Sequence, residues 1–388
     1  MSGSREKEKK YTGFEQGPIR PPSEANSLLI RITRNCPWNR CTFCPVYKGA
    51  AFSLRPVDHV IQDIDDISRH INVLRQRGNQ DGQISREDLN AYNTKLDASE
   101  RQTFYAAVNW FACGMQSVFL QDANSLIVKP ADLVAILRHL MKCFPWVDRI
   151  TSYARSHTVA RISDQNLKSY AEAGLNRIHI GLESGSDEVL TFVKKGVDKQ
   201  THVRAGLKVK KAGIELSEYV MPGLGGKGLS EIHALETADA LNQINPDFIR
   251  LRTLAIPNNV ELYDEYASGR FEKLTDVETA RELLLFLENL DSITSFIKSD
   301  HILNLFEEVE GKFPEDKERI TGVIRNFFAM EPHQRMLYQV GRRLGLFSQL
   351  SDLNNSQLAA KAEEACRQYD IDPENVDRVI NELMKRFI

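Results

Sequence analysis

The stretch Asn35-Cys36-Pro37-Trp38-Asn39-Arg40-Cys41-Thr42-Phe43-Cys44-Pro45 directly follows an apolar run at residues 28–32. Its spacing, Cys-x4-Cys-x2-Cys, is short enough for one loop to direct three thiolates at a single inorganic centre. Soft thiolate ligands suit zinc or an iron–sulfur cluster. A closed zinc or cubane site usually needs four protein ligands. Three close cysteines without a fourth on the same loop therefore predict a cluster with one iron open to an external ligand.

This loop resembles the signature loop of the radical S-adenosylmethionine (SAM) superfamily. The resemblance implies that Cys36, Cys41 and Cys44 hold a [4Fe-4S] cluster and that SAM chelates the fourth iron. Phe43, the aromatic residue before the last cysteine, also fits the family and is a candidate SAM contact. The first gap is one residue longer than the commonest family spacing, which places the chain in a less common subgroup. The alternative is a structural zinc knuckle that borrows a distant histidine or cysteine.

Length and composition set the broad class of the protein. With 388 residues, the chain forms either two domains or one large α/β domain. A net charge of −3 does not indicate a general nucleic-acid binder. No apolar run approaches the ~20 residues of a membrane span, and the polar N-terminus does not read as a signal peptide. Six cysteines, three of them clustered, do not suggest a disulfide framework, so we expect a cytoplasmic protein.

A regular alternation of strands and helices runs through the first two thirds of the chain. Strand-like runs are expected at residues 28–33, 117–120, 149–153, 177–182, 214–221 and 248–254. Helical stretches are expected between them at residues 130–143, 163–173, 199–212 and 229–244. This rhythm predicts parallel βαβ units. Six repeats are too few for a closed eight-stranded barrel, and the family resemblance implies a partial (β/α)6 barrel.

The departures from this rhythm define the other parts. We predict a flexible N-terminal arm at residues 1–27, the partial barrel at 28–256 with a helical insertion at about 76–112, and a helical C-terminal extension at 257–388. Within the insertion, residues 78–84 resemble an EF-hand loop, but Arg77 takes the place of the first ligand and should repel calcium. We expect an ordinary turn there, followed by a helix from Ser85 with Asp88 at the capping-box position.

Polar residues at the strand ends are the candidate ligand contacts, because parallel α/β folds bind ligands there. Asp122 follows the second strand, where the resemblance implies a carboxylate for the SAM amino group. Alternatively, Asp122 caps the loop that precedes Pro130. Ser152 and Arg155 end the third strand, and the arginine can bind a carboxylate of SAM or of the substrate. His157 reads as an ordinary loop histidine.

The fourth strand ends in the segment Gly181-Leu182-Glu183-Ser184-Gly185, a second point of resemblance. In the family, the acidic residue accepts hydrogen bonds from the SAM ribose hydroxyls or amine, which implies that role for Glu183. A carboxylate can accept from both vicinal hydroxyls, and glycine permits close approach of the backbone. Ser184 and Ser186 are expected to bind the SAM carboxylate or to cap the following helix.

Charged residues on the fifth and sixth strands complete the candidate set. The resemblance places the fifth strand under the adenine or ribose, which makes Glu218 a candidate SAM contact. Arg250 and Arg252 are expected to share one face of the sixth strand. Buried arginines need partners, so one is expected to pair with Glu218 or Glu183 and the other to bind an anionic substrate. The glycine-rich loop at residues 223–226 alone is a weak indication of a phosphate site.

These features predict a radical SAM enzyme. The resemblance implies reductive cleavage of SAM by the [4Fe-4S] cluster, giving a 5′-deoxyadenosyl radical that acts on a small, anionic substrate. A reductant such as flavodoxin or ferredoxin is an expected partner, whereas nucleic acid and membrane are not. Because the other three cysteines are scattered, a second cluster and sulfur insertion are not expected. The alternative function is a non-catalytic binding or sensing protein stabilised by zinc or an iron–sulfur cluster.

Overall fold

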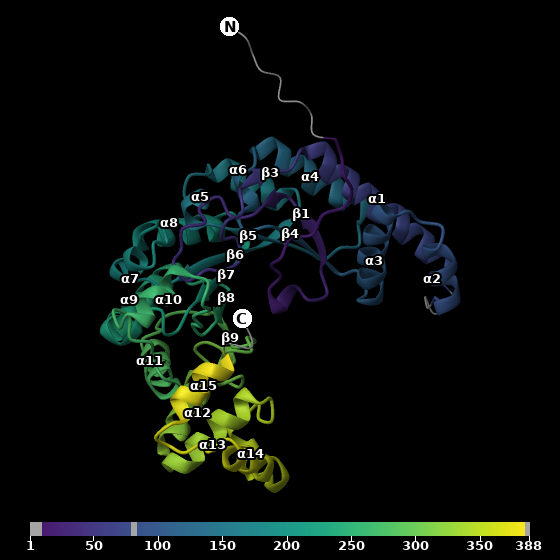
Figure 1. The fold of residues 1–388 in the computed structure, drawn as a ribbon. Helices are drawn as coiled ribbons and strands as arrows, with labels where there is room; N and C mark the ends of the chain where they lie inside the picture. The colour runs from purple at the N-terminus through teal and green to yellow at the C-terminus, as the bar shows by residue number, and fades with distance from the viewer. Residues whose placement is uncertain (1–9, 79–83, 385–388) are drawn as a thin grey trace. The chain divides into compact units, whose positions relative to one another are not determined.

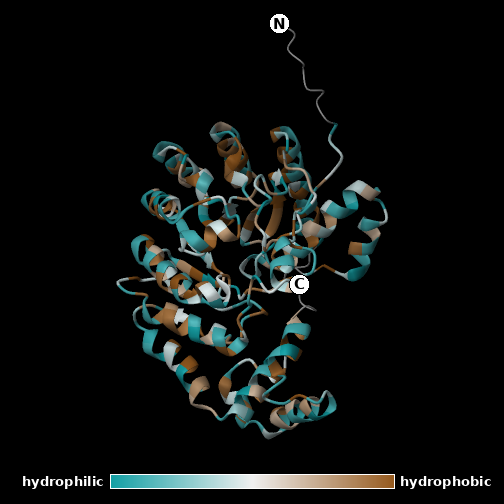
Figure 2. Ribbon diagram, turned by 60° about the vertical axis from the view of Figure 1, so that its left-hand side comes forward, coloured by the Kyte–Doolittle hydropathy of each residue, from teal (hydrophilic) through white to brown (hydrophobic). Residues whose placement is uncertain are grey.

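The computed structural model describes residues 10–78 and 84–384 as an α/β fold. Its main sheet has the strand order β1-β4-β5-β6-β7-β8-β9-β10. The pairs β1–β4, β4–β5, β7–β8 and β8–β9 are parallel, and β10 pairs antiparallel with β9. In Figure 2 the helices carry both brown and teal, as expected for helices with one face buried and one face exposed. The predicted α/β class with a parallel sheet is confirmed.

All six expected strands form. They are β1 (Leu28–Arg31), β4 (Ser117–Gln121), β5 (Arg149–Ala154), β6 (Leu175–Glu183), β7 (Glu215–Val220) and β8 (Phe248–Leu251). Two further strands, β9 (Phe296–Lys298) and β10 (Gly311–Lys312), extend the sheet from a region where the sequence predicted only helices. These strands are too short to show a period-two pattern. A separate pair, β2 (Thr33–Arg34) and β3 (Ser53–Leu54), is antiparallel.

The chain divides into two compact units. The first comprises residues 1–37, 50–153 and 165–177, and the second comprises 38–49, 154–164 and 178–388. The cysteine loop crosses this division, because Cys36 belongs to the first unit and Cys41 and Cys44 belong to the second. The predicted domain boundaries stay a prediction.

In the first unit, one long helix packs against two others. The unit contains α1 (Val57–Arg77), α2 (Arg86–Asn93), α3 (Ala98–Ala112), α4 (Pro130–Cys143) and most of α6 (Asp164–Glu172). Helix α1 packs against both α3 and α4, and Figure 1 shows the three helices side by side. Its buried residues recur at helical spacing. At the start of α2, the Ser85 hydroxyl accepts from the Asp88 N–H and donates to the Asp88 carboxylate, so the predicted helix start is confirmed.

The segment that precedes β1 is packed rather than loose over its described part. The Tyr11 hydroxyl donates to Asp63, Phe14 is buried, and the buried Glu24 carboxylate accepts from Ser27. The expected turn in place of a calcium loop, with Asn79, Asp81 and Gly82, lies outside the described residues.

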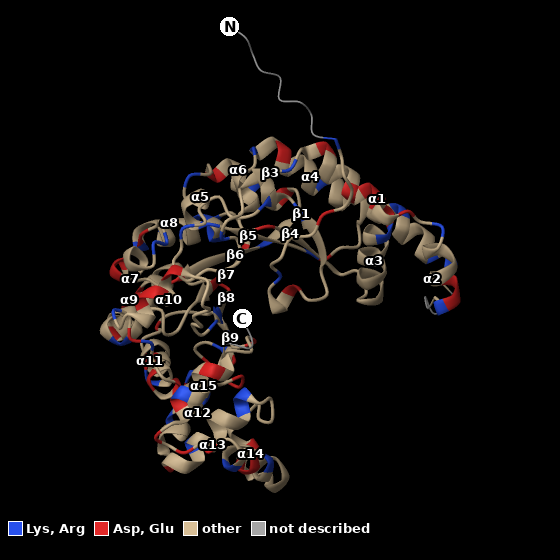
Figure 3. Ribbon diagram, viewed as in Figure 1, with Lys and Arg blue, Asp and Glu red and all other residues tan. Residues whose placement is uncertain are grey.

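The second unit holds the rest of the helices. They are α5 (Ser156–Val159), α7 (Asp187–Phe192), α8 (Lys199–Lys211), α9 (Gly226–Ile244), α10 (Glu261–Ala267), α11 (Asp276–Glu288), α12 (Lys317–Ala329), α13 (Pro332–Arg343), α14 (Ser356–Gln368) and α15 (Val376–Met384). Loops at residues 330–331 and 369–375 separate α12 from α13 and α14 from α15. Figure 3 shows acidic and basic residues interspersed on these helices. Among the described residues, none of the helices combines the length and apolar character needed to cross a membrane.

Candidate functional site

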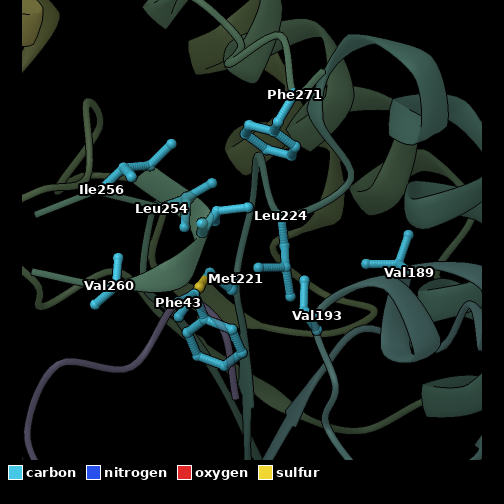
Figure 4. Packing of buried hydrophobic residues seen from close by; sticks show 10 residues of the cluster. Phe43, Val189, Val193, Met221, Leu224, Leu254, Ile256, Val260 and Phe271 are labelled. Carbon is cyan, nitrogen blue, oxygen red and sulfur yellow. The ribbon is translucent and has the colours of Figure 1, made fainter. Parts of the chain in front are cut away.

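The cysteine loop in the second unit is anchored in an apolar cluster. Phe43 is buried among residues from α7, the β7–α9 connection and the segment after β8, and Cys41 and Cys44 pack against this cluster from its edge. Figure 4 shows Phe43 beside Met221 and Val193. The two sulfur atoms therefore border a surface from which water is largely excluded. Such surroundings, together with soft donors, suit an iron–sulfur cluster.

Backbone hydrogen bonds fix the loop on both sides of Phe43. The Thr42 N–H donates to the Val193 carbonyl at 3.0 Å, and the Thr42 carbonyl accepts from the Leu262 N–H at 3.0 Å. The Cys44 N–H reaches the Cys41 carbonyl at 3.4 Å. The segment after α7 and the start of α10 thus hold the two cysteines in place.

Trp38 makes a further attachment to the turn after α7. Its Nε1–H donates to the Lys194 carbonyl at 2.7 Å, and its ring lies against Gly196. Gly196 has φ +71°, and a Cβ there would approach the indole to 2.2 Å. Only glycine accommodates both the left-handed backbone and the ring. The Arg155 guanidinium carbon lies 5.1 Å from the centroid of the same ring.

Lys195 brings the cysteine loop together with the predicted Glu183 contact. Its ammonium donates to Glu183 Oε1 at 3.1 Å and lies 5.9 Å from the Phe43 ring centroid. Burial lowers the pKa of Lys195, but the nearby Glu183 and Cys41 raise it more, so the net pKa lies above its ordinary value. The lysine is therefore a fixed positive charge between a carboxylate and a cysteine sulfur.

Glu218 on β7 is a buried carboxyl group in the same region. Neither of its oxygens has a hydrogen-bond partner, and the side chain is fully buried. Burial raises its pKa well above the ordinary value; Lys195 offsets part of this effect, and Glu183 adds to it. The backbone of Leu182 is near enough to favour the ionised form, but it does not hydrogen-bond either oxygen. A protonated Glu218 can donate a hydrogen bond or release its proton.

Ser184 faces helix α9 rather than open space. Its hydroxyl accepts from the Ser186 N–H at 3.0 Å and lies 2.8 Å from His233 Nδ1. Because His233 Nε2 lies 3.1 Å from the Met221 carbonyl, we assign the ring proton to Nε2, with Ser184 donating to Nδ1. The prediction that one of these serines caps the next helix is confirmed for Ser186, which caps α7, and not for Ser184. A role toward SAM stays a prediction.

Close packing against α9 explains why a glycine occupies position 185 in the same turn. A Cβ on Gly185 would lie 2.2 Å from the Glu236 carbonyl oxygen, and the Gly185 N–H donates to Thr237. The sequence interpretation had linked this glycine to a ligand, but α9 occupies the space. Glu183 itself has φ +64° and directs its carboxylate to Lys195.

The arginine pairings expected from sequence are wrong. Arg250 donates to Asp300 at 2.7 Å and to the Ser217 hydroxyl, not to Glu183 or Glu218. The parallel register aligns Arg250 with Lys298 on β9, which brings Asp300, just beyond, within reach. Arg252 lies past the end of β8 and is exposed, so the two arginines do not share one buried face.

The remaining predicted contacts lie elsewhere or have protein partners. In the first unit, Asp122 Oδ2 accepts from Arg31 at 2.8 Å and from the Asn35 N–H at 3.3 Å, directly before Cys36. Ser152 is buried, and its hydroxyl donates to the Tyr153 carbonyl. In the second unit, Arg155 donates to the Lys195 carbonyl at 2.9 Å. The SAM contacts assigned to Asp122, Ser152 and Arg155 stay predictions.

Sequence reasoning missed two contributors to this site. Lys195 and Trp38 were not among the candidates, although both lie beside residues that were. Gly196, which follows two lysines, could have pointed to Lys195. A glycine there marks a tight turn shortly after the Glu-Ser-Gly segment. Which of the two lysines turns inward depends on the tertiary fold: Lys195 is nearly buried, whereas Lys194 pairs with Glu261 at the surface.

One sequence family matches the central part of the chain. Residues 114–238 match the sequence model of the radical SAM superfamily. The matched span contains Glu183 and Glu218 but not the cysteine loop. Members of this superfamily use a [4Fe-4S] cluster and SAM.

Two relatives and one solved structure illustrate the similarity. The chain is 27% identical over 244 residues to tRNA-2-methylthio-N(6)-dimethylallyladenosine synthase of Hahella chejuensis, covering 60% of this chain and 44% of that protein. It is 22% identical over 129 residues to tRNA uridine(34) acetyltransferase of Methanocaldococcus infernus, covering 33% and 24%. The chain thus spans less than half the length of these relatives. Coproporphyrinogen III oxidase of Escherichia coli aligns with a TM-score of 0.44 at 14% identity, covering 68% of this chain and 52% of the other.

Proposed function

We propose that this chain, of which residues 114–238 match the radical SAM superfamily, is an enzyme that cleaves SAM reductively. The proposed cluster ligands are Cys36, Cys41 and Cys44. The cluster supplies the electron that converts SAM to methionine and a 5′-deoxyadenosyl radical. The observation that carries the proposal is the meeting of two distant motifs at one side chain: Lys195 contacts Glu183 and lies over Phe43 of the cysteine loop.

The chain's own residues support such a site in three ways. The apolar cluster around Phe43 limits access of water to Cys41 and Cys44. Lys195 places a positive charge near Cys41, which favours the thiolate form and an anionic cluster. Glu183 keeps one carboxylate oxygen, Oε2, that is not used by Lys195 in the described contacts, and it is the proposed acceptor for the SAM ribose or amine.

For the substrate, we propose a small anionic molecule recognised through Arg252. Of the two arginines that suggested an anion, Arg250 is neutralised by Asp300, whereas Arg252 is exposed at the end of β8. Parallel α/β folds bind ligands at this end of their strands. A reductant such as flavodoxin or ferredoxin is the proposed electron donor.

A nucleic-acid substrate is the second candidate. It is favoured by the names of the relatives from Hahella chejuensis and Methanocaldococcus infernus, both of which refer to tRNA. The composition argues against it, because the net charge is −3 and basic residues alternate with acidic ones on the helices (Figure 3).

The test is anaerobic reconstitution followed by product analysis. We expect the wild-type chain to bind about four irons, to lose visible absorbance on reduction by dithionite and to release 5′-deoxyadenosine from SAM. Cys41→Ala should lose the iron. Glu183→Gln should keep the iron but bind SAM at least about tenfold more weakly, because an ionised acceptor is replaced by a neutral one.

Two controls separate the outcomes. Cys113→Ser changes an exposed cysteine far along the chain from the loop and should leave iron and product unchanged. Faster 5′-deoxyadenosine release with total tRNA, but not with anionic metabolites, would replace the small-molecule proposal by the nucleic-acid one. A colourless protein that binds zinc at Cys41 and leaves SAM intact would contradict the enzyme proposal itself.

A further inference from the structure

Three potential metal ligands converge between two helices of the first unit. Asp65 lies on α1, and His139 and Cys143 lie one turn apart on α4, which packs against α1. His139 Nε2 is 2.7 Å from Asp65 Oδ1 and 3.5 Å from Cys143 Sγ, and Cys143 Sγ is 3.9 Å from the same carboxylate oxygen. All three ligand atoms thus lie within 4.8 Å of one another.

The geometry differs from that of a nucleophilic triad. In a relay, the carboxylate holds one nitrogen of the imidazole while the nucleophile contacts the other. Here the carboxylate and the sulfur approach the same atom, Nε2 of His139. Oxygen, nitrogen and sulfur donors that converge on one point instead resemble three ligands of a single metal ion.

The separations fit a tetrahedral zinc ion. Zn–S, Zn–N and Zn–O bonds of about 2.3, 2.05 and 2.1 Å at tetrahedral angles place sulfur about 3.6 Å from the other two donors, and nitrogen and oxygen about 3.4 Å apart. The sulfur distances of 3.5 and 3.9 Å already match this pattern. Only Asp65 and His139 must separate by several tenths of an ångström, and the Asp65 side chain is half exposed, which leaves space for such a shift.

We propose that Asp65, His139 and Cys143 bind one Zn²⁺, with water as the fourth ligand. Imidazole and thiolate are preferred zinc ligands, and the carboxylate and thiolate together balance the charge of the ion. Binding releases the Cys143 thiol proton to solvent. The exposure of Asp65 (50%) and His139 (23%) leaves room for the water ligand. Because the ligands come from both helices, the ion ties α1 to α4.

The experiment measures zinc beside iron in the full chain. After anaerobic reconstitution, so that the cluster-loop cysteines are occupied, the protein is equilibrated with Zn²⁺, desalted and analysed for both metals. We expect about one zinc per chain in addition to the cluster iron. His139→Ala and Cys143→Ser should each keep the iron but lower zinc affinity by roughly 100-fold or more, since even outer-shell partners are worth 10- to 100-fold.

Cys113→Ser is the matched control for loss of a cysteine in the same unit, since its sulfur lies beside Asn26 and not beside a histidine. It should retain the zinc. Circular dichroism of the His139 and Cys143 variants establishes that they are folded. The proposal is overturned if the wild-type chain retains no zinc, or if folded His139→Ala and Cys143→Ser chains retain as much as wild type. Because metal content is the readout, neither result depends on SAM cleavage.

Discussion

The ion pair between Lys195 and Glu183 allows a quantitative test of the candidate site. At 3.1 Å, two unit charges attract by about 5 kcal/mol at an effective dielectric constant of 20. Desolvation and side-chain ordering offset part of this attraction. The two side chains are 12% and 14% exposed, so the pair lies between the surface and fully buried limits. We therefore expect a coupling free energy of about 2 to 3 kcal/mol.

A double-mutant cycle measures this coupling. Lys195→Met keeps an unbranched chain against Phe43 without the charge, and Glu183→Gln keeps the shape of the carboxylate. Urea unfolding of the apoprotein, followed by tryptophan fluorescence, gives the free energy of unfolding for wild type, both single variants and the double variant. The losses of unfolding free energy in the two single variants should add up to more than the loss in the double variant. The reason is that each single change leaves a nearly buried charge without its partner.

The neighbouring pair Lys194–Glu261 is the matched control. Its charged atoms are closer, at 2.6 Å, but its side chains are 59% and 50% exposed. The cycle with Lys194→Met and Glu261→Gln should therefore give at most about 1 kcal/mol. If the two cycles give equal couplings, or the surface pair gives the larger one, then burial does not set the strength of the Lys195–Glu183 pair and the reasoning is refuted.

Three further predictions concern buried groups of the second unit. Because the pKa of Glu218 is raised in the folded state, ionisation favours unfolding above the ordinary pKa of about 4.5. Glu218→Gln should thus gain stability relative to wild type by up to about 1.4 kcal/mol per pH unit until the folded-state pKa is reached, and a pH-independent difference in urea unfolding would contradict this. Burial lowers the pKa of His202 to about 3, so wild type should lose up to about 1.4 kcal/mol per pH unit as the pH falls below about 6.5, and His202→Asn should flatten this loss in thermal unfolding at pH 4 to 7. Gly185→Ala forces a Cβ against the backbone of α9 and should cost about 1 to 3 kcal/mol, whereas Gly228→Ala, with open space on the same helix, should cost nothing; equal costs would show that α9 gives way.

The resemblance to the radical SAM superfamily was visible in the sequence because it depends on local patterns. The spacing of Cys36, Cys41 and Cys44 and the Gly-x-Glu-Ser-Gly segment at residues 181–185 suggested the superfamily, and the sequence model of that superfamily matches residues 114–238. The six strands followed from buried apolar runs at regular intervals. The strands β9 and β10 escaped notice because runs of two or three residues carry no period.

Which charged side chains pair with one another depends on the tertiary structure alone. Nothing local distinguishes Lys194 from Lys195, yet one lies at the surface and the other joins Glu183 to the cysteine loop. The expected pairing of one of the two arginines with Glu218 or Glu183 missed Asp300, the partner of Arg250, because Asp300 follows a strand that the sequence did not reveal. Which donor a charged group meets depends on strand register and helix packing, and these are set by contacts between segments far apart in the chain.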